Sequence, residues 1–386
     1  MILVPMMLRC YHLHRNSCFM GHAQANRRRV IPDDVQVIQS GEMNMKKIFV
    51  TCIAVLGLCA ITGLTAFAAE KAEFRGTGYF SVPDWFKQGF LDMPEDVAEA
   101  SRSGKRLLIY FGQEGCPYCA ALFNTNFSQP HIVDYTRKHF DAVDLNIWGD
   151  REVTDLSGSK LTEKELAAKL QVWFTPSILL IDEKGEIVLR INGYYPPHQF
   201  LAALKYVGEK QEGSLTFPEY YAKLAPPPSK GVLQSEPFFS KPPYNLKKLA
   251  AGKPLAVFFE QKDCAGCDQM HSKILHDPET LKLIGQYNVI QLDRWDRTPI
   301  ITPDGRQTTA RDWANELKIA YVPNVVLFDA GKEVIRIEAF MKSFHFQSVL
   351  DYVSSGAYKK QPSLQRYIRA RADDLREHGV VVDIWK

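Results

Sequence analysis

Four cysteines of this chain lie in two Cys-x-x-Cys pairs, a spacing that brings two thiols within one helical turn of each other. The pairs are Cys116 with Cys119 and Cys264 with Cys267. Disulfide exchange needs a thiolate that attacks, a second thiol that resolves the mixed disulfide, and access for the partner. Thiolates also bind soft metal ions. The residue types therefore allow redox exchange, metal binding or structural disulfides.

Metal binding and structural disulfides are the less favoured of these interpretations. Zinc ribbons place two such pairs about 15 to 20 residues apart, whereas these pairs are separated by 148 residues. A local copper or zinc site is a second metal alternative. His271 follows Cys267 by four residues, on the same face of the helix that is expected to begin at the pair, and thiolates with imidazole suit these metals. The simpler interpretation of His271 is a partly buried helical histidine. A disulfide between residues three apart closes a very small loop and stabilises little, which favours redox exchange.

The two pairs belong to a longer internal repeat. Residues of the same type recur at offsets of 148 or 147 residues: Gly104 and Gly252, Pro130 and Pro278, Trp148 and Trp295, Thr162 and Thr309, Pro176 and Pro323. Such self-similarity is typical of a duplicated domain. We therefore expect two copies of one domain, and we expect the recurring tryptophans to pack rather than to bind a ligand.

Each copy shows the same order of expected elements. In the first copy these are strands at 107–111 and 140–145, a helix starting at the cysteine pair, a helix from Thr162 to just before Pro176, a hairpin of 177–182 and 186–191, and a closing helix through 200–207. In the second copy they are strands at 255–259 and 289–292, a helix at the cysteines, a helix from Thr309 to just before Pro323, a hairpin of 324–329 and 333–337, and a closing helix through 346–353. This order predicts an α/β fold with a central mixed β-sheet flanked by helices.

A Cys-x-x-Cys pair at a strand-to-helix corner, with a proline about 60 residues later ahead of a hairpin, resembles the thioredoxin superfamily. The stretch between the second strand and the proline is long, which makes the chain more similar to exported thioredoxin-related proteins of the SoxW type. The resemblance implies two tandem thioredoxin-like domains, at 72–224 and 232–386. A proline-rich linker at 225–231 is expected to join them.

The resemblance also implies a role for each cysteine. Cys116 and Cys264 would attack from a helix N-terminus, where unpaired amide groups favour the thiolate. Cys119 and Cys267, one turn further on, would resolve the mixed disulfide.

Two prolines complete the sites that the resemblance implies. Pro176 and Pro323 are expected to follow cis peptide bonds. In such proteins the residue before the proline, here Thr175 or Val322, pairs with an extended substrate strand. We therefore expect Thr175, Pro176, Val322 and Pro323 to bind substrate.

The chain departs from the family pattern beside the cysteines. The buried acid expected six residues before each pair is replaced by Tyr110 and Phe258. General-base help must therefore come from elsewhere. Glu114, Glu260 and Asp263 are near in sequence, although charged side chains at such places are expected to be solvated.

The two pairs are not expected to be equally reactive. Gly115 and Asp263 replace the tryptophan that precedes the first cysteine in the family. Asp263 should raise the pKa of the adjoining Cys264 thiol by charge repulsion. The Ala265-Gly266 dipeptide should loosen the first turn there, whereas Pro117 should pre-organise the turn at Cys116.

The N-terminal part reads as a targeting signal. Residues 48–69 carry no charge, follow Lys46 and Lys47, and contain the small-x-small pattern Ala66-Phe67-Ala68. We expect a signal peptide at 43–68 with cleavage after Ala68, and residues 1–42 to be a leader that is either not translated or disordered. The alternative is an uncleaved membrane anchor.

Composition and charge limit the remaining function classes. The formal net charge of +3 is too small for a nucleic-acid binder, and 46% hydrophobic residues exclude a disordered chain. We expect an exported, periplasmic thiol-disulfide oxidoreductase that acts on client proteins without a cofactor. The resemblance suggests a reductase supplied with electrons by a membrane thiol carrier. The alternative is a metal- or client-binding module with little turnover.

Overall fold

Each copy is built around a central strand that is buried along its whole length. These strands are β2 (Arg106–Gly112) in the first copy and β9 (Leu255–Glu260) in the second. A strand covered on both faces is a continuous apolar run in sequence. This explains why both strands were predictable.

The computed structural model describes residues 71–386 apart from Gln88, Phe90, 225–231, Asp263, Phe340 and Lys386. The predicted signal peptide, the alternative anchor, the leader and the linker lie outside the described residues. No helix among the described residues is long and apolar enough to cross a membrane.

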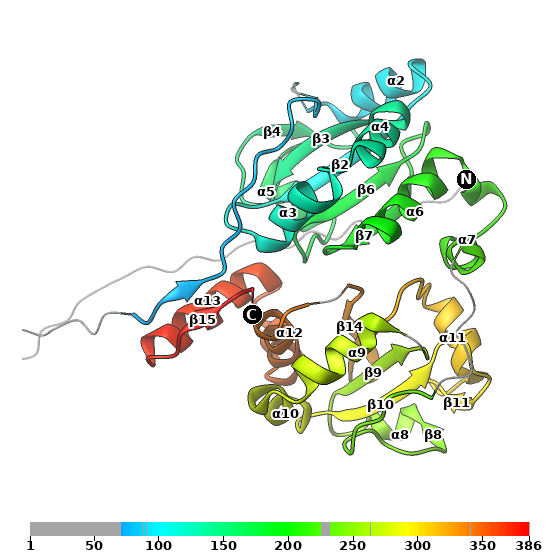
Figure 1. The fold of residues 1–386 in the computed structure, drawn as a ribbon, viewed down its shortest axis with the longest axis vertical. Coiled ribbons are helices and arrows are strands. Elements are labelled where there is room, and N and C mark those ends of the chain that lie inside the picture. Colours follow the sequence, from blue (N-terminus) through cyan, green and yellow to red (C-terminus); the bar gives the residue numbers. More distant parts are fainter. Residues whose placement is uncertain are drawn as a thin grey trace, which may run out of the picture. The chain divides into compact units, whose positions relative to one another are not determined.

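The central sheets are mixed and have the same strand order in both copies (Figure 1). In the first copy the order is β3 (Phe140–Asn146), β2, β6 (Ser177–Ile181) and β7 (Ile187–Asn192). In the second it is β10 (Asn288–Asp293), β9, β13 (Asn324–Asp329) and β14 (Lys332–Ile337). The first pair in each order is parallel and the other two pairs are antiparallel. The two expected α/β domains with mixed sheets are confirmed.

Helices flank both sheets. In the first copy they are α2 (Met93–Arg102), α3 (Pro117–Ala121) with its π-helical continuation η1 (Leu122–Asn126), α4 (Pro130–His139), α5 (Glu163–Lys169), α6 (Pro197–Gly208), η2 (Gln211–Gly213) and α7 (Phe217–Leu224). In the second copy they are α8 (Leu246–Leu249), α9 (Ala265–Gln269) with η3 (Met270–Leu275), α10 (Pro278–Ile284), α11 (Ala310–Glu316), α12 (Ser343–Ser354), η4 (Ala357–Lys359) and α13 (Leu364–Glu377).

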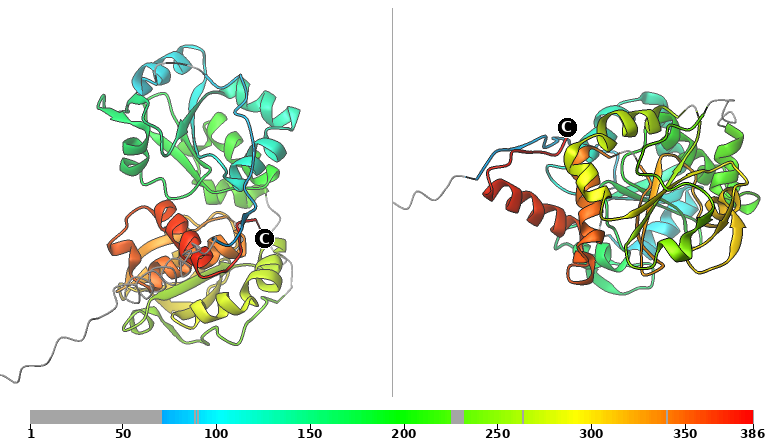
Figure 2. Two further views of the ribbon diagram at one scale, coloured as in Figure 1. Left: turned by 90° about the vertical axis from the view of Figure 1, so that its left-hand side faces the viewer. Right: turned by 90° about the horizontal axis from the view of Figure 1, so that it is seen from below.

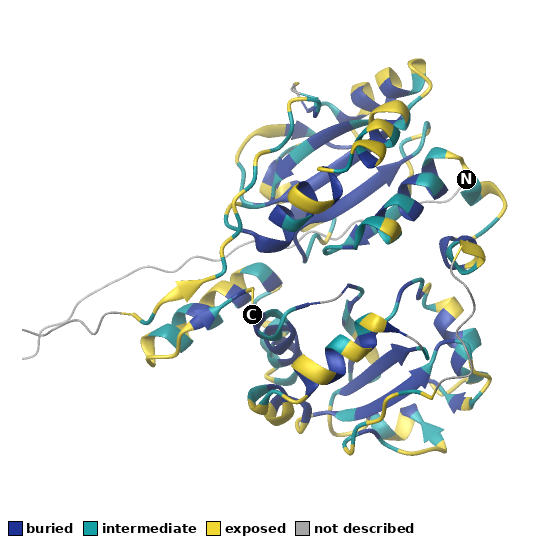
Figure 3. Cartoon of the chain, in the orientation of Figure 1, coloured by how far each residue is buried: buried dark blue, intermediate teal, exposed yellow. Residues whose placement is uncertain are grey.

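Alternate residues of the central strand enter two different cores, because successive side chains of a strand point to opposite faces. Leu108 and Tyr110 of β2 pack with Phe123 and Phe200, which come from η1 and α6. Leu107, Ile109 and Phe111 lie in a second core with residues of α2 and α5. Figure 3 shows the strands buried between these layers.

The helices that follow the second strand begin where expected but end earlier. Thr162 caps α5 with a complete capping box, and Thr309 caps α11 by accepting the amide of Asp312. We expected both helices to reach the residue before the proline. They end at Lys169 and Glu316 instead, because the backbone turns into the left-handed region at Gln171 and Lys318 shortly afterwards.

Several elements had not been expected. In the first copy a hairpin is formed by β4 (Glu152–Thr154) and β5 (Lys160–Thr162), which are joined by residues 155–159. In the second copy β11 (Pro299–Ile301) and β12 (Gln307–Thr309) form the corresponding hairpin. The two-residue strand β8 (Tyr244–Asn245) pairs with β11.

The first and last described segments also pair. β1 (Phe74–Arg75) lies parallel to β15 (Val382–Asp383), as the two views of Figure 2 show. Apolar side chains of α13 and β15 join the core of the second copy.

Candidate active sites

The first cysteine pair lies where the central strand gives way to a helix. Cys116 is the N-cap of α3, and its Sγ accepts a hydrogen bond from the backbone amide of Cys119 at 3.0 Å. The two cysteines form a disulfide with Cα atoms 5.2 Å apart. Cys119 is fully buried and Cys116 is 4% exposed. The predicted start of a helix at the pair is confirmed.

The second pair repeats this geometry. Cys264 is the N-cap of α9, and its Sγ accepts the amide of Cys267 at 3.0 Å. The pair forms a disulfide with Cα atoms 5.1 Å apart, and both cysteines are buried. The amide contact is therefore the same at both sites and does not distinguish them.

The predicted prolines lie beside the cysteines. The Thr175–Pro176 and Val322–Pro323 peptide bonds are both cis, as the resemblance implied. In the first copy the Thr175 hydroxyl donates to Cys116 Sγ at 3.4 Å, and the Thr175 carbonyl oxygen lies at the same distance from this sulfur. The binding of substrate by these residues stays a prediction.

In the second copy the cysteine helix packs closely against the proline. A Cβ atom on Gly266 would lie 2.9 Å from Cδ of Pro323. The residue between the cysteines is therefore packed against the proline. The loosening of the first turn by Gly266 stays a prediction, and the structure adds that a larger residue there would have to displace Pro323.

A glutamine beside each pair was missed. Gln113 accepts a hydrogen bond from the Trp148 ring at 2.6 Å and donates to the Thr175 hydroxyl at 3.0 Å. In the second copy Gln261 accepts from the Trp295 ring at 3.0 Å. The tryptophans thus hold a polar side chain next to the cysteine loop, beyond the packing role expected. The recurrence of the glutamines at an offset of 148 residues was the available signal.

The first pair borders a cavity of about 630 Å³. Side chains from both copies line it, among them Cys116, Trp148, Thr175, Met341 and Gln365. Gln365 of α13 donates to the carbonyl oxygen of Trp173 at 3.0 Å, next to the predicted substrate edge. The cavity gives Cys116 a neighbouring space of the size of a small ligand or a short peptide segment.

The three acidic candidates have different environments. Glu114 is exposed. Asp263 lies outside the described residues, so its effect on Cys264 stays a prediction. Glu260 had been expected to be solvated, and this was wrong: it is 1% exposed. Its carboxylate is bonded to His271 and Gln291, which offsets part of the cost of burying a charge.

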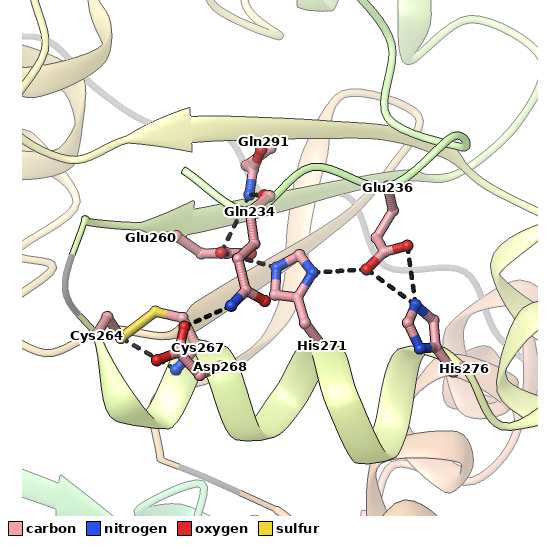
Figure 4. A network of polar contacts seen from close by, with 9 residues as sticks. All are labelled: Gln234, Glu236, Glu260, Cys264, Cys267, Asp268, His271, His276 and Gln291. Atoms are coloured by element: carbon pink, nitrogen blue, oxygen red, sulfur yellow. Dashed lines mark hydrogen bonds and ion pairs between the residues drawn. A yellow bond between two sulfur atoms is a disulfide. The ribbon is translucent and has the colours of Figure 1, made fainter. Parts of the chain in front are cut away.

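His271 is buried, in agreement with the simpler of the two interpretations. It is 2% exposed, and its two ring nitrogens lie 2.8 Å from Glu236 Oε1 and 3.0 Å from Glu260 Oε2 (Figure 4). Both nitrogens therefore face carboxylates. Within residues 71–386, as far as they are described, no group of three His, Cys, Asp or Glu side chains is placed to hold a metal ion. Neither metal interpretation gains support.

In the first copy Gly112 stands at the position of Glu260, and the phenol of Tyr110 lies where a side chain at this position would be. Tyr110 is 2% exposed, and burial raises the pKa of its hydroxyl far above the ordinary value. The hydroxyl has no hydrogen-bond partner among the described residues. At physiological pH this group therefore stays neutral.

The family of thioredoxin-like domains matches residues 93–208 and 247–354, one stretch in each copy. Among solved structures, the chain is similar to a thioredoxin-fold protein from Helicobacter pylori, with 29% identity, a TM-score of 0.28, and coverage of 33% of this chain and 88% of that chain. A thioredoxin from Thermus thermophilus has 25% identity and a TM-score of 0.24, covering 35% and 87%. The oxidised C-terminal domain of DsbD from Neisseria meningitidis has 13% identity and a TM-score of 0.23, covering 30% and 89%. No curated protein matches the chain.

Proposed function

Since this chain belongs to the family of thioredoxin-like domains, which matches both of its copies, we propose that it exchanges disulfides with client proteins through two Cys-x-x-Cys sites. Cys116 attacks a client disulfide and forms a mixed disulfide, and one client thiolate leaves. Cys119 then attacks Cys116 Sγ, which releases the second client thiolate and forms the disulfide Cys116–Cys119. Cys264 and Cys267 repeat the scheme. The client is reduced and the pair is oxidised.

The placement of each attacking sulfur at a helix start carries this proposal. The Sγ atoms of Cys116 and Cys264 each accept a backbone amide at 3.0 Å. A hydrogen bond donated to a thiolate stabilises the charged form and lowers the pKa of the thiol. The resolving cysteine is buried one turn further on in both copies, where it is protected from other partners.

We further propose that the protein is exported and works as a reductase of the SoxW type, with electrons supplied by a membrane thiol carrier. The uncharged run at 48–69 and its small-x-small ending support export. The direction of electron flow depends on the reduction potential, which spans about 150 mV among proteins of this kind. Equilibration of each pair with glutathione buffers measures it. A potential near the oxidising end of that range would contradict the reductase.

Reduction of insulin disulfides by the protein and dithiothreitol tests the activity itself. We expect the protein to accelerate insulin precipitation. A variant in which the four cysteines of the two pairs are changed to serine should give only the background rate. If the native protein is no faster than this variant, disulfide exchange with proteins is wrong. The variant is a matched control because serine keeps the size of the side chain and removes only the thiol chemistry.

A further inference from the structure

A cluster of two carboxylates and one imidazole lies beside the second cysteine pair. Glu260 and His271 are buried, and Glu236 is partly buried. Glu260, the last residue of β9, places Oε2 within 3.0 Å of His271 Nε2 and accepts from the Gln291 side chain at 3.1 Å. Its other oxygen, Oε1, is buried and has no hydrogen-bond partner among the described residues. On the far side of the ring, His271 Nδ1 lies 2.8 Å from Glu236 Oε1. We refer to these residues as the Glu236–His271–Glu260 cluster.

The carboxylates of the cluster stabilise the protonated form of the His271 imidazole. Burial alone would lower the pKa of His271, but the hydrogen bonds and charges of Glu260 and Glu236 outweigh it and raise this pKa. Burial alone would raise the pKa of Glu236, but hydrogen bonds from His271 and His276 lower it. The hydrogen bonds of the cluster leave one carboxylate oxygen free among the described residues: both oxygens of Glu236 and Oε2 of Glu260 are bonded to imidazoles, whereas Oε1 of Glu260 is not bonded.

The cluster is placed next to the resolving cysteine. His271 follows Cys267 by four residues along α9 and η3, so the two side chains share one face of the helix. Cys267 is 3% exposed. In Figure 4 the Glu260 carboxylate lies between the His271 ring and the disulfide. Glu260, which carries the unpartnered oxygen Oε1, is thus the carboxylate of the cluster on the side of Cys267.

The first copy has neither the glutamate nor the histidine of this cluster at the positions that the repeat assigns to them. Gly112 stands 148 residues before Glu260, and Phe123 stands 148 residues before His271. A Cβ on Gly112 would overlap the hydroxyl of Tyr110, so the phenol takes the space of the Glu260 side chain. This phenol is neutral, because burial raises its pKa. The two copies share a fold and a cysteine geometry but differ in this acceptor.

We propose that Glu260 accepts the proton of the Cys267 thiol when the second pair resolves a mixed disulfide, and that His271 positions Glu260 for this transfer. The inference rests on the proposed function and deepens it. The S–H proton of Cys267 passes to Glu260 Oε1, and the sulfur attacks Cys264 Sγ. The bond between Cys264 and the client sulfur breaks, the electron pair leaves with the client sulfur, and that thiolate takes a proton from water. The pair is oxidised and the client is reduced.

The charged and titratable groups around the site come from several elements. They are Glu260 on β9, Asp268 on α9, His271 on η3, His276 at the end of η3, and Glu236 on the segment before β8. Asp268 accepts from Gln234, whose backbone oxygen accepts from Gln291, so this carboxylate belongs to the same network. A change at any of them should shift the pH profile of the second pair. The variants tested must therefore keep the others.

The test follows the second pair alone. It uses the protein with Cys116→Ser and Cys119→Ser, in which the four cysteines outside the two pairs, Cys10, Cys18, Cys52 and Cys59, are also changed to serine. The reduced protein is mixed rapidly with 5,5′-dithiobis(2-nitrobenzoate). Cys264 releases one nitrothiobenzoate in a step that depends on reagent concentration, and Cys267 releases the second in a step that does not. We measure the second rate from pH 5 to pH 10. General-base catalysis contributes about 100-fold or more, so Glu260→Gln should lower this rate about 100-fold at pH 6 and hardly at all at pH 10.

Matched variants separate proton transfer from a merely structural effect. His271→Gln keeps a donor to Glu260 and should retain more of the rate at pH 6 than His271→Phe, which copies Phe123. Tyr110→Phe in the protein with Cys264→Ser and Cys267→Ser should leave the first pair unchanged. If circular dichroism shows that Glu260→Gln does not fold, the pH profile of the second release step in the protein that keeps Glu260 tests the inference instead. Without an internal base, the rate of this step rises tenfold per pH unit up to the thiol pKa.

The outcomes distinguish the inference from the proposed function. A second step with this tenfold rise, or one that Glu260→Gln does not alter at pH 6, overturns the role of Glu260 and leaves disulfide exchange intact. Absence of any second step in the native second pair contradicts the proposed function at this pair. A shallower profile that becomes steep in Glu260→Gln supports the inference.

Discussion

In the first copy the side chain of Tyr110 fills the space beside the Cα atom of Gly112, because a Cβ on Gly112 would overlap the hydroxyl and ring of Tyr110. Both residues lie in β2, two positions apart, so their side chains point to the same face. Glycine at 112 is therefore required by the phenol and not by a backbone angle. The second copy has Phe258 and Glu260 at these positions. Phe258 lacks the hydroxyl, and the Glu260 carboxylate occupies the space that the hydroxyl fills in the first copy.

Gly112→Ala should accordingly destabilise the first copy. Overpacking a full core costs about 1 to 3 kcal/mol, and we expect a loss of this size in the free energy of unfolding, measured by denaturant titration. Gly213→Ala serves as the control, because a Cβ there meets no atom within 4 Å. Tyr110→Phe should recover part of the loss. An unchanged stability of Gly112→Ala would contradict the overlap.

Protonation of His271 should make stability depend on pH. Its folded pKa lies above the ordinary 6.5, so its contribution is present below that value and is lost as pH rises through the folded pKa. The folded pKa of Glu236 lies below the ordinary 4.5, so its contribution is present above 4.5 and is lost as pH falls through the folded pKa. Together they stabilise most between pH 4.5 and 6.5.

We therefore expect the difference in unfolding free energy between the native protein and His271→Phe to peak within that window and to shrink at alkaline pH. Denaturant titrations at a series of pH values measure it. His378→Phe is a suitable control, because that histidine is exposed and pairs only with Asp374 among the described residues. A difference that grows above pH 8 would show that the imidazolium does not stabilise the fold.

Gly266→Ala tests the packing of the second cysteine helix. Helix propensity alone predicts a gain of about 1 kcal/mol. The new Cβ would lie 2.9 Å from Pro323 Cδ, and overpacking costs about 1 to 3 kcal/mol. The clash should prevail, so we expect lower stability and slower exchange at the second pair. A more stable protein with unchanged exchange would show that the proline can move away.

The duplication and the central elements could be predicted from sequence because their signals are local. The apolar runs of β2 and β9, and the caps at Thr162 and Thr309, lie within short windows. Glu260 could not be placed in this way. A carboxylate at the end of a strand is usually solvated, and its burial depends on partners that only the fold brings together. His271 lies 11 residues from Glu260 and 35 residues from Glu236.

The pairing of β1 with β15 also has no local signal. Each strand has two residues, and they come from opposite ends of the described chain. Gln113 and Gln261 differ from this case, because their recurrence matches that of the cysteines. A search of the repeat for polar residues would have found them.

Export is tested by the N-terminus of the protein in the cell envelope. We expect N-terminal sequencing to begin at Ala69, because cleavage should follow the small-x-small pattern that ends at Ala68. Ala66→Leu and Ala68→Leu should block processing, whereas a change at Phe67 should not. Recovery of the intact chain with residues 48–69 in the membrane fraction would indicate an anchor.

The last prediction is that the two pairs contribute unequally to activity. Cys116 Sγ accepts both the Cys119 amide and the Thr175 hydroxyl, whereas the position of Thr175 is taken by Val322 in the second copy. A hydrogen bond to a charged group contributes about 1.5 to 3 kcal/mol, and each 1.4 kcal/mol corresponds to a tenfold change. We expect the thiolate fraction of Cys116 to exceed that of Cys264 at least about tenfold.

Cys116→Ser should therefore abolish most insulin reduction, and Cys264→Ser should leave most of it. Thr175→Val gives the first copy the residue of the second, and it should raise the pKa of Cys116 and lower the activity without removing a cysteine. Alkylation rates at a series of pH values measure both thiol pKa values. If Cys264→Ser is as damaging as Cys116→Ser, electrons pass through both pairs in series, because independent sites would each retain their own activity.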